Sequence, residues 1–501
     1  MGSERILAID QGTTSTRAVM FDAACRALAT AQKPLPQIYP ANGWVEHDPE
    51  EIWTATLDVA REVIAKTCGV DGVAAIGITN QRETTIVWDR ATGKPITNAI
   101  VWQDRRGETL CASLRDAGHT DVIQKKTGLL IDSYFSATKL KWIFDNVAGA
   151  RDAAKAGKLA AGTIDTFLLW RLTGGRIHAT DATNASRTML FDIHAGRWDE
   201  DLLKLFDVPA NVLPAVRNTA DDFGTTDAAL FGRTIPIRAL VGDQQGALVG
   251  QACFTPGMIK STYGTGCFVL ANTGDTALAS RNRLLTTIAY RLNGKTTYAL
   301  EGSIFNAGTV IQWLRDNAKM LGASAESERH AAALDDTGGA NGVYFVPAFT
   351  GLGAPHWDAH ARGAILGLTR DSSAGHIVRA ALESVCYQTA DLLNAFREDG
   401  IAAPSALRVD GGMTANTWLL QFLADIADVT VERPAYGETT VLGAAFLAAL
   451  GIGLFRSLDD VKTAWQLGFR AVPKMAAPTR RAHVAGWREA VSRVTTRPKA
   501  G

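Results

Sequence analysis

The chain has 501 residues, with 51 basic and 51 acidic side chains, so its formal net charge is zero. At about 150 residues per domain, this length fits three ordinary domains or two large ones. Hydrophobic residues make up 47% and charged residues 20% of the chain. This balance excludes a disordered protein and indicates a globular one with a sizeable core.

The charge balance also bears on the kind of partner. A nucleic-acid-binding protein carries a basic excess or basic runs, which this chain lacks. We interpret its densest basic segment as a solvated helix face and tail, comprising Arg480, Arg481, Arg488, Arg493, Arg497 and Lys499. The longest uncharged apolar run, 441–455, is shorter than the ~20 residues that span a bilayer and predicts a buried core helix. We therefore expect neither a nucleic acid nor a membrane as partner.

The cysteines and the chain start indicate a compartment. Six cysteines are scattered without a CxxC pair, as expected of reduced thiols in a cytoplasmic protein. Residues 1–5 lead straight into a strand-like run and lack the long apolar region of a signal peptide. We therefore expect a cytoplasmic protein.

The first elements form a hairpin followed by alternating helices and strands. Two apolar strands, 6–9 and 18–21, flank a polar turn. A helix follows, with Asp48 as N-cap and Pro49 as its first residue. Strands at 73–78 and 84–89 come next. This alternation predicts the α/β class.

The pattern restarts near residue 235. A strand at 237–241 precedes a second hairpin, whose strands at 258–262 and 267–270 flank a second Gly-Thr tip. Two such tips, far apart in the chain, predict a duplicated architecture with a boundary near residue 250.

The first hairpin tip, Asp10–Ser15, has the composition of a phosphate-binding turn. Gly12 permits a tight turn whose amide groups form an anion-binding concavity. Further donors come from the hydroxyls of Thr13, Thr14 and Ser15, and Arg17 adds a positive charge. Asp10, at the end of the strand, is placed to hold Mg²⁺ through water. The alternative is an ordinary hairpin with a solvated polar tip. A P-loop motif and a GxGxxG after the first strand are both absent.

Two further glycine-rich turns occur later in the chain. Tyr263–Gly266 repeats the hairpin tip, and Val409–Asn416 joins a strand to a helix. The paired glycines of the second turn would let a flat group such as adenine approach the backbone. Each turn is a weak signal singly, but their order along the chain strengthens the prediction of a nucleotide site.

Polar clusters follow several predicted strands. They are Arg82-Glu83, Trp102–Arg105 and Asp243–Gln245. Ligands of open α/β sheets bind beyond the carboxyl ends of the strands. An Arg-Glu pair with an Asp suits a small polyhydroxylated substrate, because each hydroxyl needs a donor and an acceptor. The alternative for Arg82-Glu83 is a structural ion pair.

These segments together resemble the FGGY family of carbohydrate kinases, over nearly the whole chain from Ile6 to about Trp487. The segments that carry the resemblance are Ile9–Ser15, Trp44–Pro49, Gly77–Thr85, Tyr134–Lys139, Gly242–Gln245, Thr262–Phe268, Pro347–Pro355, Gly363–Glu383 and Arg408–Gly412. The resemblance implies two actin-like ATPase domains of the ribonuclease H-like fold, flanking a deep cleft. We expect residues 1–250 to bind polyol and phosphate and residues 251–501 to bind the nucleotide.

The resemblance also implies a role for individual residues. Asp243 would be the general base, and Mg²⁺ would lie near Asp10 and Asp243. The implied glycerol pocket consists of Arg82, Glu83, Trp102, Tyr134, Asp243, Gln244 and Phe268. Thr13, Thr14, Ser15 and Arg17 would contact the β- and γ-phosphates, with Thr265 and Gly266 opposite them. Gly308, Gln312, Gly412 and Asn416 would hold the rest of the nucleotide.

The similarity is greatest to family members that act on glycerol. It implies ATP-dependent phosphorylation of glycerol to sn-glycerol 3-phosphate, the first step of glycerol catabolism, with ATP and Mg²⁺ as cofactors. The family further suggests a homodimer or homotetramer.

Two other functions compete with this one. The first is a kinase for a pentulose or another polyol, for which the pocket of Arg82, Glu83, Trp102 and Phe268 leaves little room. The second is an actin-like or chaperone-like ATPase, which would need neither the polar cluster between residues 80 and 134 nor a base at Asp243.

Overall fold

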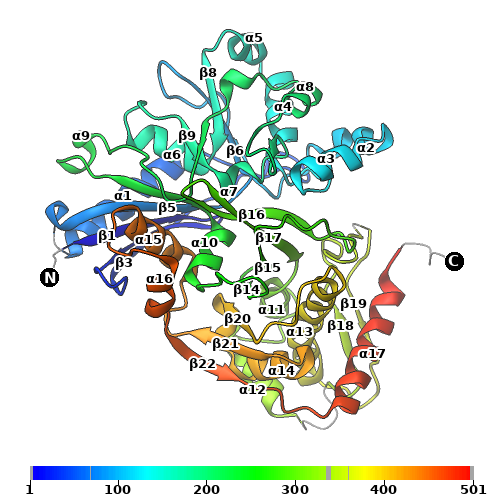
Figure 1. The fold of residues 1–501 in the computed structure, drawn as a ribbon. Helices are drawn as coiled ribbons and strands as arrows, with labels where there is room; N and C mark the ends of the chain where they lie inside the picture. Colours follow the sequence, from blue (N-terminus) through cyan, green and yellow to red (C-terminus); the bar gives the residue numbers. More distant parts are fainter. Residues whose placement is uncertain (1–3, 68, 335–339, 359, 497–501) are drawn as a thin grey trace.

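The computed structural model describes residues 4–67, 69–334, 340–358 and 360–496. Two large β-sheets lie side by side, each covered by helices, with a smaller sheet beyond the first (Figure 1). The mixture of helices and strands confirms the predicted α/β class.

The first sheet has five strands. Strand β2 is antiparallel to its neighbours β1 and β3, whereas β5 and β13 run parallel to β1. In spatial order they are β13 (Ile237–Gly242), β5 (Val73–Asn80), β1 (Arg5–Gln11), β2 (Ser15–Phe21) and β3 (Ala27–Pro34).

The second sheet repeats this arrangement. In spatial order it consists of β16 (Leu285–Leu292), β17 (Lys295–Ile304), β15 (Cys267–Gly274), β14 (Ile259–Tyr263), β20 (Ala406–Asp410), β21 (Thr430–Pro434) and β22 (Leu467–Ala471). Strands β14, β15 and β17 are antiparallel, whereas β20 and β21 are parallel to β14. Strand directions along β21-β20-β14-β15-β17 thus match those along β13-β5-β1-β2-β3, which confirms the predicted duplication at the level of topology.

The smaller sheet is inserted between strands of the first. It contains β4 (Glu46–His47), β7 (Ala99–Ile100), β6 (Thr85–Asp89) and β8 (Leu159–Thr163). The helices and short strands of this region are α2 (Glu108–Asp116), α3 (Thr120–Thr127), α4 (Ser136–Asn146), α5 (Ala150–Lys155), α6 (Ile164–Leu172), β9 (Ala179–Asp181), α7 (Ala182–Ala185), β10 (Phe191–Asp192), β11 (Arg197–Trp198), α8 (Glu200–Leu205), β12 (Ala215–Arg217) and α9 (Ala228–Phe231).

Helix α1 (Pro49–Thr67) begins where the sequence predicts. Asp48 Oδ1 accepts a hydrogen bond from the backbone N–H of Glu50 at 2.8 Å, which satisfies a donor of the first turn. Ile52, Val59 and Val63 are buried on one face, as a helical repeat requires. This face packs on β2 and β3.

Helices α10 (Asp243–Gly250) and α15 (Thr439–Gly451) cross between the two sheets (Figure 1). Although α15 follows β21 in the chain, it packs against β1, β5 and β13 of the first sheet. Residues 441–449 are buried, so the apolar run does form the predicted core helix, which ends at Gly451. The crossing is close because a Cβ on Gly443 would lie 1.8 Å from the Gly246 carbonyl oxygen.

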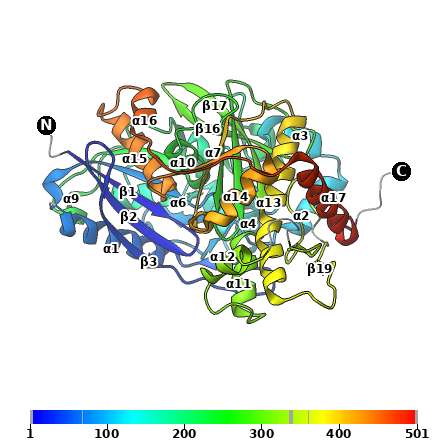
Figure 2. The same cartoon turned by 90° about the horizontal axis from the view of Figure 1, so that it is seen from below.

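Long helices cover the second sheet, and the C-terminal helix lies at the edge of the molecule (Figure 2). The remaining elements are α11 (Gly308–Asp316), α12 (Glu326–Ala332), β18 (Tyr344–Val346), β19 (Ala364–Leu366), α13 (Ala374–Glu398), α14 (Thr417–Ala427), α16 (Leu458–Ala464) and α17 (Ala477–Val494). Arg481, Arg488 and Arg493 are exposed on α17, as predicted for this basic segment, and Arg497 and Lys499 lie outside the described residues. Arg480 differs from the prediction, because it is partly buried and its Nη2 donates to Asp428 Oδ2 at 2.8 Å.

Five cysteines are free and buried, and the sixth, Cys68, lies outside the described residues. Across the described part of the chain, no helix has the length and apolarity needed to cross a membrane.

The helix crossing predicts a stability effect. In Gly443→Ala the new methyl group would collide with backbone of α10, which can move only if the helices separate. Such overpacking costs about 1–3 kcal/mol, so for a chain of this length we expect the midpoint of thermal unfolding to fall by about 1–3 °C. Calorimetry of the purified variant measures the change.

A second helical glycine serves as the control. A Cβ on Gly375, in the first turn of α13, would lie 3.5 Å from its nearest neighbour, an ordinary contact. Gly375→Ala should leave the midpoint unchanged or raise it slightly, because alanine favours helix. Equal midpoints for the two variants would contradict a close helix crossing.

Candidate active site

Two of the predicted polar clusters meet at one edge of the first sheet. Strands β5 and β13 are parallel neighbours with Asn80 opposite Gly242, so the residues that follow them emerge together. Arg82 Nε lies 3.1 Å from Asp243 Oδ1. Asp243 is the first residue of α10, and its Oδ1 also accepts a hydrogen bond from the Gln244 backbone N–H at 2.7 Å.

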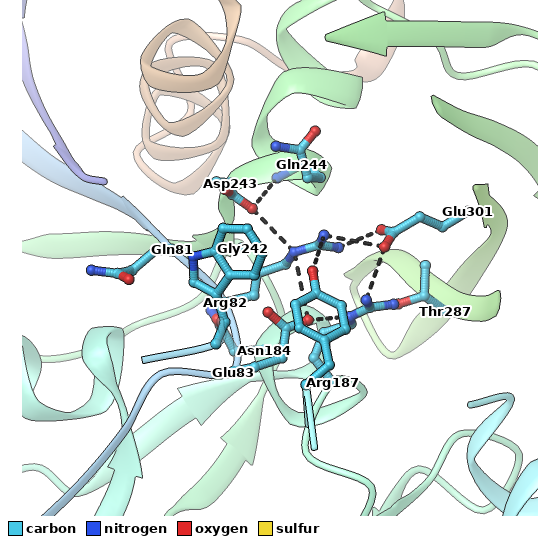
Figure 3. A network of polar contacts seen from close by, with 12 residues as sticks. Gln81, Arg82, Glu83, Asn184, Arg187, Gly242, Asp243, Gln244, Thr287 and Glu301 are labelled. Carbon is cyan, nitrogen blue, oxygen red and sulfur yellow. Dashed lines mark hydrogen bonds and ion pairs between the residues drawn. The ribbon is translucent and has the colours of Figure 1, made fainter. Parts of the chain in front are cut away.

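Arg82 and Glu83 belong to a buried ring of alternating charges that Figure 3 shows. Both oxygens of the Glu301 carboxylate accept hydrogen bonds from Arg82, and its Oε1 also accepts one from Arg187 at 2.8 Å. Arg187 Nε donates to Glu83 Oε1 at 2.7 Å, and Arg82 Nε lies 3.9 Å from the same oxygen. The four side chains are at most 2% exposed.

The two carboxylates of this ring differ in basicity. Burial would raise the pKa of Glu301, but the adjacent Arg187 and Arg82 outweigh burial and hold the pKa below its usual value. For Glu83, burial outweighs the same two arginines and the pKa is raised. Glu83 also adopts a φ of 62°, in the left-handed region that favours glycine. Backbone strain of this kind concentrates at functional sites.

Three aromatic side chains form a wall beside the ring. The ring centroids of Trp102 and Tyr134 are 5.6 Å apart, and those of Trp102 and Phe268 are 6.3 Å apart, both edge to face. Trp102 Nε1–H donates to Thr13 Oγ1 at 2.9 Å. This hydrogen bond joins the predicted polyol residues to the predicted phosphate-binding hairpin.

Gln244 contacts a buried lysine of the second sheet. Lys260 Nζ, on β14, donates to Gln244 Oε1 at 2.5 Å and to Thr262 Oγ1 at 2.9 Å. An ammonium group can only donate, so the amide oxygen of Gln244 must face it and the amide N–H groups point elsewhere. Burial lowers the pKa of Lys260.

The first hairpin tip forms the tight turn that the sequence predicts. The Gly12 N–H donates to the Ser15 carbonyl oxygen at 2.9 Å, and Ser15 Oγ accepts from Gln32 Nε2 at 2.8 Å. Thr14 is exposed. Arg17 forms an ion pair with Glu438, the residue before α15, and its Nη2 donates to Gln32 Oε1 at 3.1 Å.

Asp10 lies beside this tip, and the negative charge of Asp243 affects its pKa. Burial raises the pKa of Asp10 to about 7, with Asp243 and Glu438 adding to the effect and Arg17 opposing it. The described residues contain no group of three or more His, Cys, Asp or Glu side chains that are close enough together to hold a metal ion. Two carboxylates fit Mg²⁺, which takes one or two carboxylates and fills its other positions with phosphate oxygens and water.

The second hairpin tip packs against the start of α11. The Gly308 N–H donates to the Gly264 carbonyl oxygen at 3.0 Å, and the Ala307 N–H donates to that of Thr265 at 3.1 Å. A Cβ on Gly266 would lie 2.7 Å from the Ile304 carbonyl oxygen. Thr265 and Gln312 are exposed. The structure thus brings Thr265, Gly266 and Gly308 together.

The third glycine-rich turn abuts the same hairpin. Gly411 has a φ of +91°, and its Cβ would lie 2.4 Å from the Tyr263 carbonyl oxygen, so only glycine fits. Among the described residues, chain neighbours aside, no atom lies within 4 Å of a Cβ built on Gly412, which leaves open space there. Asn416 Oδ1 caps α14 by accepting from the Leu419 N–H at 2.8 Å. Its buried Nδ2 has no hydrogen-bond partner among the described residues.

Three buried charged residues of this region are not predicted from the sequence. They are Arg187, Lys260 and Glu301. Lys260 is the only charged residue of β14, and Glu301 is the only one of β17 besides the exposed Lys295 at its start. Both are fully buried, a signal that a search for charges in core strands would find. Arg187 lies in a polar loop and carries no such signal.

Comparisons with known proteins agree with this geometry. Residues 5–250 match the N-terminal domain of the FGGY family of carbohydrate kinases, and residues 259–452 match its C-terminal domain. A glycerol kinase of Rhodospirillum centenum is 61% identical over 97% of both chains, and one of Ectopseudomonas mendocina is 59% identical over 98% of this chain and 99% of that one.

A solved structure extends the likeness to the fold. The glycerol kinase of Plasmodium falciparum with ADP superposes with a TM-score of 0.92 at 39% identity, covering 99% of both chains. The gluconate kinase of Lactobacillus acidophilus, at 23% identity and a TM-score of 0.89, shares the fold.

The duplicated sheets and the helices crossing between them define a two-domain protein of the actin-like ATPase fold. The chain belongs to the FGGY family of carbohydrate kinases.

The environment of Asp10 predicts a pH-dependent change in stability. An aspartate whose pKa is raised from 3.8 to about 7 opposes folding at high pH, because the folded state must hold a charge that the unfolded state carries freely. This cost is present above pH 7 and absent below pH 4. Since a tenfold change in protonation corresponds to about 1.4 kcal/mol, Asp10→Asn should raise the free energy of unfolding by about 2–4 kcal/mol at pH 8.

The measurement is urea unfolding in EDTA across pH 4 to 8. The gain from Asp10→Asn should shrink as the pH falls from 7 to 4. Asp275→Asn, at an exposed turn, is the control and should change little at any pH. A gain for Asp10→Asn that does not vary with pH would refute the expectation.

Proposed function

We propose that this protein is an ATP-dependent glycerol kinase, which transfers the γ-phosphoryl group of ATP to a terminal hydroxyl of glycerol. The observation that carries the proposal is the contact of Asp243 with Arg82, beside Glu83 and an aromatic wall. The names and full-length coverage of its relatives support the same substrate.

The polyol pocket pairs donors with acceptors. Arg82 and Glu83 fix two hydroxyls, and the Gln244 amide, turned by Lys260, donates to glycerol or to the transferred group. Trp102, Tyr134 and Phe268 cover the C–H side of the three-carbon chain. We propose that this wall leaves little room for a five-carbon sugar.

The three glycine-rich turns hold the nucleotide. Backbone N–H groups and the hydroxyls of Thr13, Thr14 and Ser15 donate to the phosphates, together with Arg17 and, from the opposite hairpin, Thr265 and Gly266. Gly308, Gln312, Gly412 and Asn416 bind the nucleoside. The orphaned Nδ2 of Asn416 and the open space at Gly412 support this placement.

Mg²⁺ would be held by Asp10 and Asp243, where it would neutralise charge on the phosphates. The raised pKa of Asp10, which reflects burial beside a second carboxylate, supports the choice of these two residues.

The proposed chemical step is an in-line displacement. The hydroxyl oxygen of glycerol attacks the γ-phosphorus, its proton passes to Asp243, and the bond to the β-phosphate oxygen breaks to release ADP. The hydrogen bond from Gln244 and the close approach of Arg82 both involve Oδ1, so Oδ2 is placed to accept the proton. The products are sn-glycerol 3-phosphate and ADP.

Several properties follow from this function. We assign polyol and phosphate binding to residues 1–250 and nucleotide binding to residues 251–501. We further propose a cytoplasmic enzyme of glycerol catabolism, a homodimer or homotetramer, that binds neither nucleic acid nor membrane.

The substrate is tested with a panel of polyols and ketoses in a coupled assay for ADP. We expect kcat/KM for glycerol to exceed that for xylulose or ribulose at least tenfold, because pocket contacts worth about 1–3 kcal/mol distinguish the substrates. A glycerol value no better than the pentulose values would favour a pentulose kinase. ATP hydrolysis that no polyol affects would favour an actin-like ATPase.

The base is tested with Asp243→Asn. We expect kcat to fall by at least ~10²–10⁴-fold, the usual loss for a general base, with the affinity for ADP in the absence of Mg²⁺ nearly unchanged. Steady-state rates and calorimetric titration of ADP measure the two quantities. Near-wild-type turnover would remove Asp243 from this role.

A further inference from the structure

The buried ring of charges connects two parts of the chain. Arg82 and Glu83 follow β5, and Arg187 follows α7, so all three belong to the first half. Glu301 alone comes from β17 of the second sheet, and its carboxylate contacts both arginines. Figure 3 shows Arg82 held between Asp243 on one side and Glu301 on the other.

The backbone of Glu301 is fixed by its neighbours. Glu301 pairs with Leu270 of β15 on one side and with Leu285 of β16 on the other. A residue inside a sheet with partners on both sides has little freedom to move. Its carboxylate is therefore a rigid support for the side chains that it touches.

Each member of the ring is needed to fix the others. Two arginines and two glutamates sum to zero charge, so burial of the ring leaves no net charge without a partner. Without Glu301, Arg82 would be balanced only by Glu83 and Asp243, and Arg187 only by Glu83. Both guanidinium groups would then be free to turn toward the remaining carboxylates.

We propose that Glu301 is a positioning residue of the polyol site. It fixes Arg82 directly and Glu83 through Arg187, so the second sheet sets the geometry of substrate residues that the first half supplies. This inference rests on the proposed function, in which Arg82 and Glu83 bind the hydroxyls. Glycerol affinity thus depends on how the two sheets are docked, whereas the nucleotide turns lie outside the ring.

The test is Glu301→Gln, which keeps the size of the side chain and removes its charge. We expect the KM for glycerol to rise at least about tenfold, while the KM for ATP and the affinity for ADP change less than about twofold. Initial rates at saturating concentrations of the other substrate give both KM values. Glu301→Asp, which keeps the charge on a shorter side chain, should recover part of the lost glycerol affinity.

Glu383→Gln is the matched control. Glu383 is also a buried glutamate paired with a buried arginine, since Arg379 Nε donates to its Oε1 at 2.9 Å, but this pair lies on α13. Glu383→Gln should leave both KM values unchanged. A role for Glu301 in folding alone would give the same pattern in both variants and would overturn the proposal.

The remaining outcomes are also decisive. Equal rises in the KM for glycerol and for ATP would indicate a general defect at the interface and overturn the proposal. If Glu301→Gln does not fold, an unchanged glycerol KM in folded Glu301→Asp would overturn it, and a raised one would support it. A wild-type enzyme that does not use glycerol refutes the proposed function instead, and the same variants are then measured with the polyol that it does use.

Discussion

The close crossing of α10 and α15 is the constraint on which the site depends. At this crossing helix backbone meets helix backbone, because a Cβ on Gly250 would lie 2.0 Å from the Thr439 carbonyl oxygen and one on Gly443 would meet Gly246. Each helix starts at the site: α10 with Asp243 and α15 directly after Glu438, which pairs with Arg17. The positive ends of two helix dipoles therefore point to the region where a polyphosphate would be held.

The same crossing explains why polar side chains from the first half of the chain contact side chains from the second half. Arg17 meets Glu438, Gln244 meets Lys260, and Arg82 meets Glu301, each pair joining the first half of the chain to the second. Ordering a long side chain costs conformational entropy, and burying a charged one costs hydration free energy. Such pairs therefore persist only where the backbone fixes both partners. The strands and helices that carry these residues provide that support.

Much of the fold follows from local sequence, whereas contacts between distant segments do not. The hairpins, the start of α1 at Pro49 and the strands that end at Asn80 and Gly242 all follow from periodicity, capping and turn residues. The apolar run 441–455 predicts a buried helix, but nothing local shows that it packs on the first sheet. Similarly, Arg82 and Asp243 are expected at strand ends, but Glu301 becomes a partner only once β17 is placed. The resemblance to a family supplies roles for Gly308 and Gln312, which no local motif indicates.

The zero net charge of the chain limits how the protein can attract phosphate. A protein that binds a polyanion is expected to attract it with a positive field, and this chain has none overall. Its buried arginines at the proposed polyol site are neutralised by Glu83 and Glu301, and Arg17 is paired with Glu438. Attraction of phosphate therefore falls to short-range donors, namely backbone N–H groups, hydroxyls, helix N-termini and, as proposed above, the guanidinium group of Arg17. Such donors act only on a group already in contact with them, so composition alone carries no trace of the charge of the ligand.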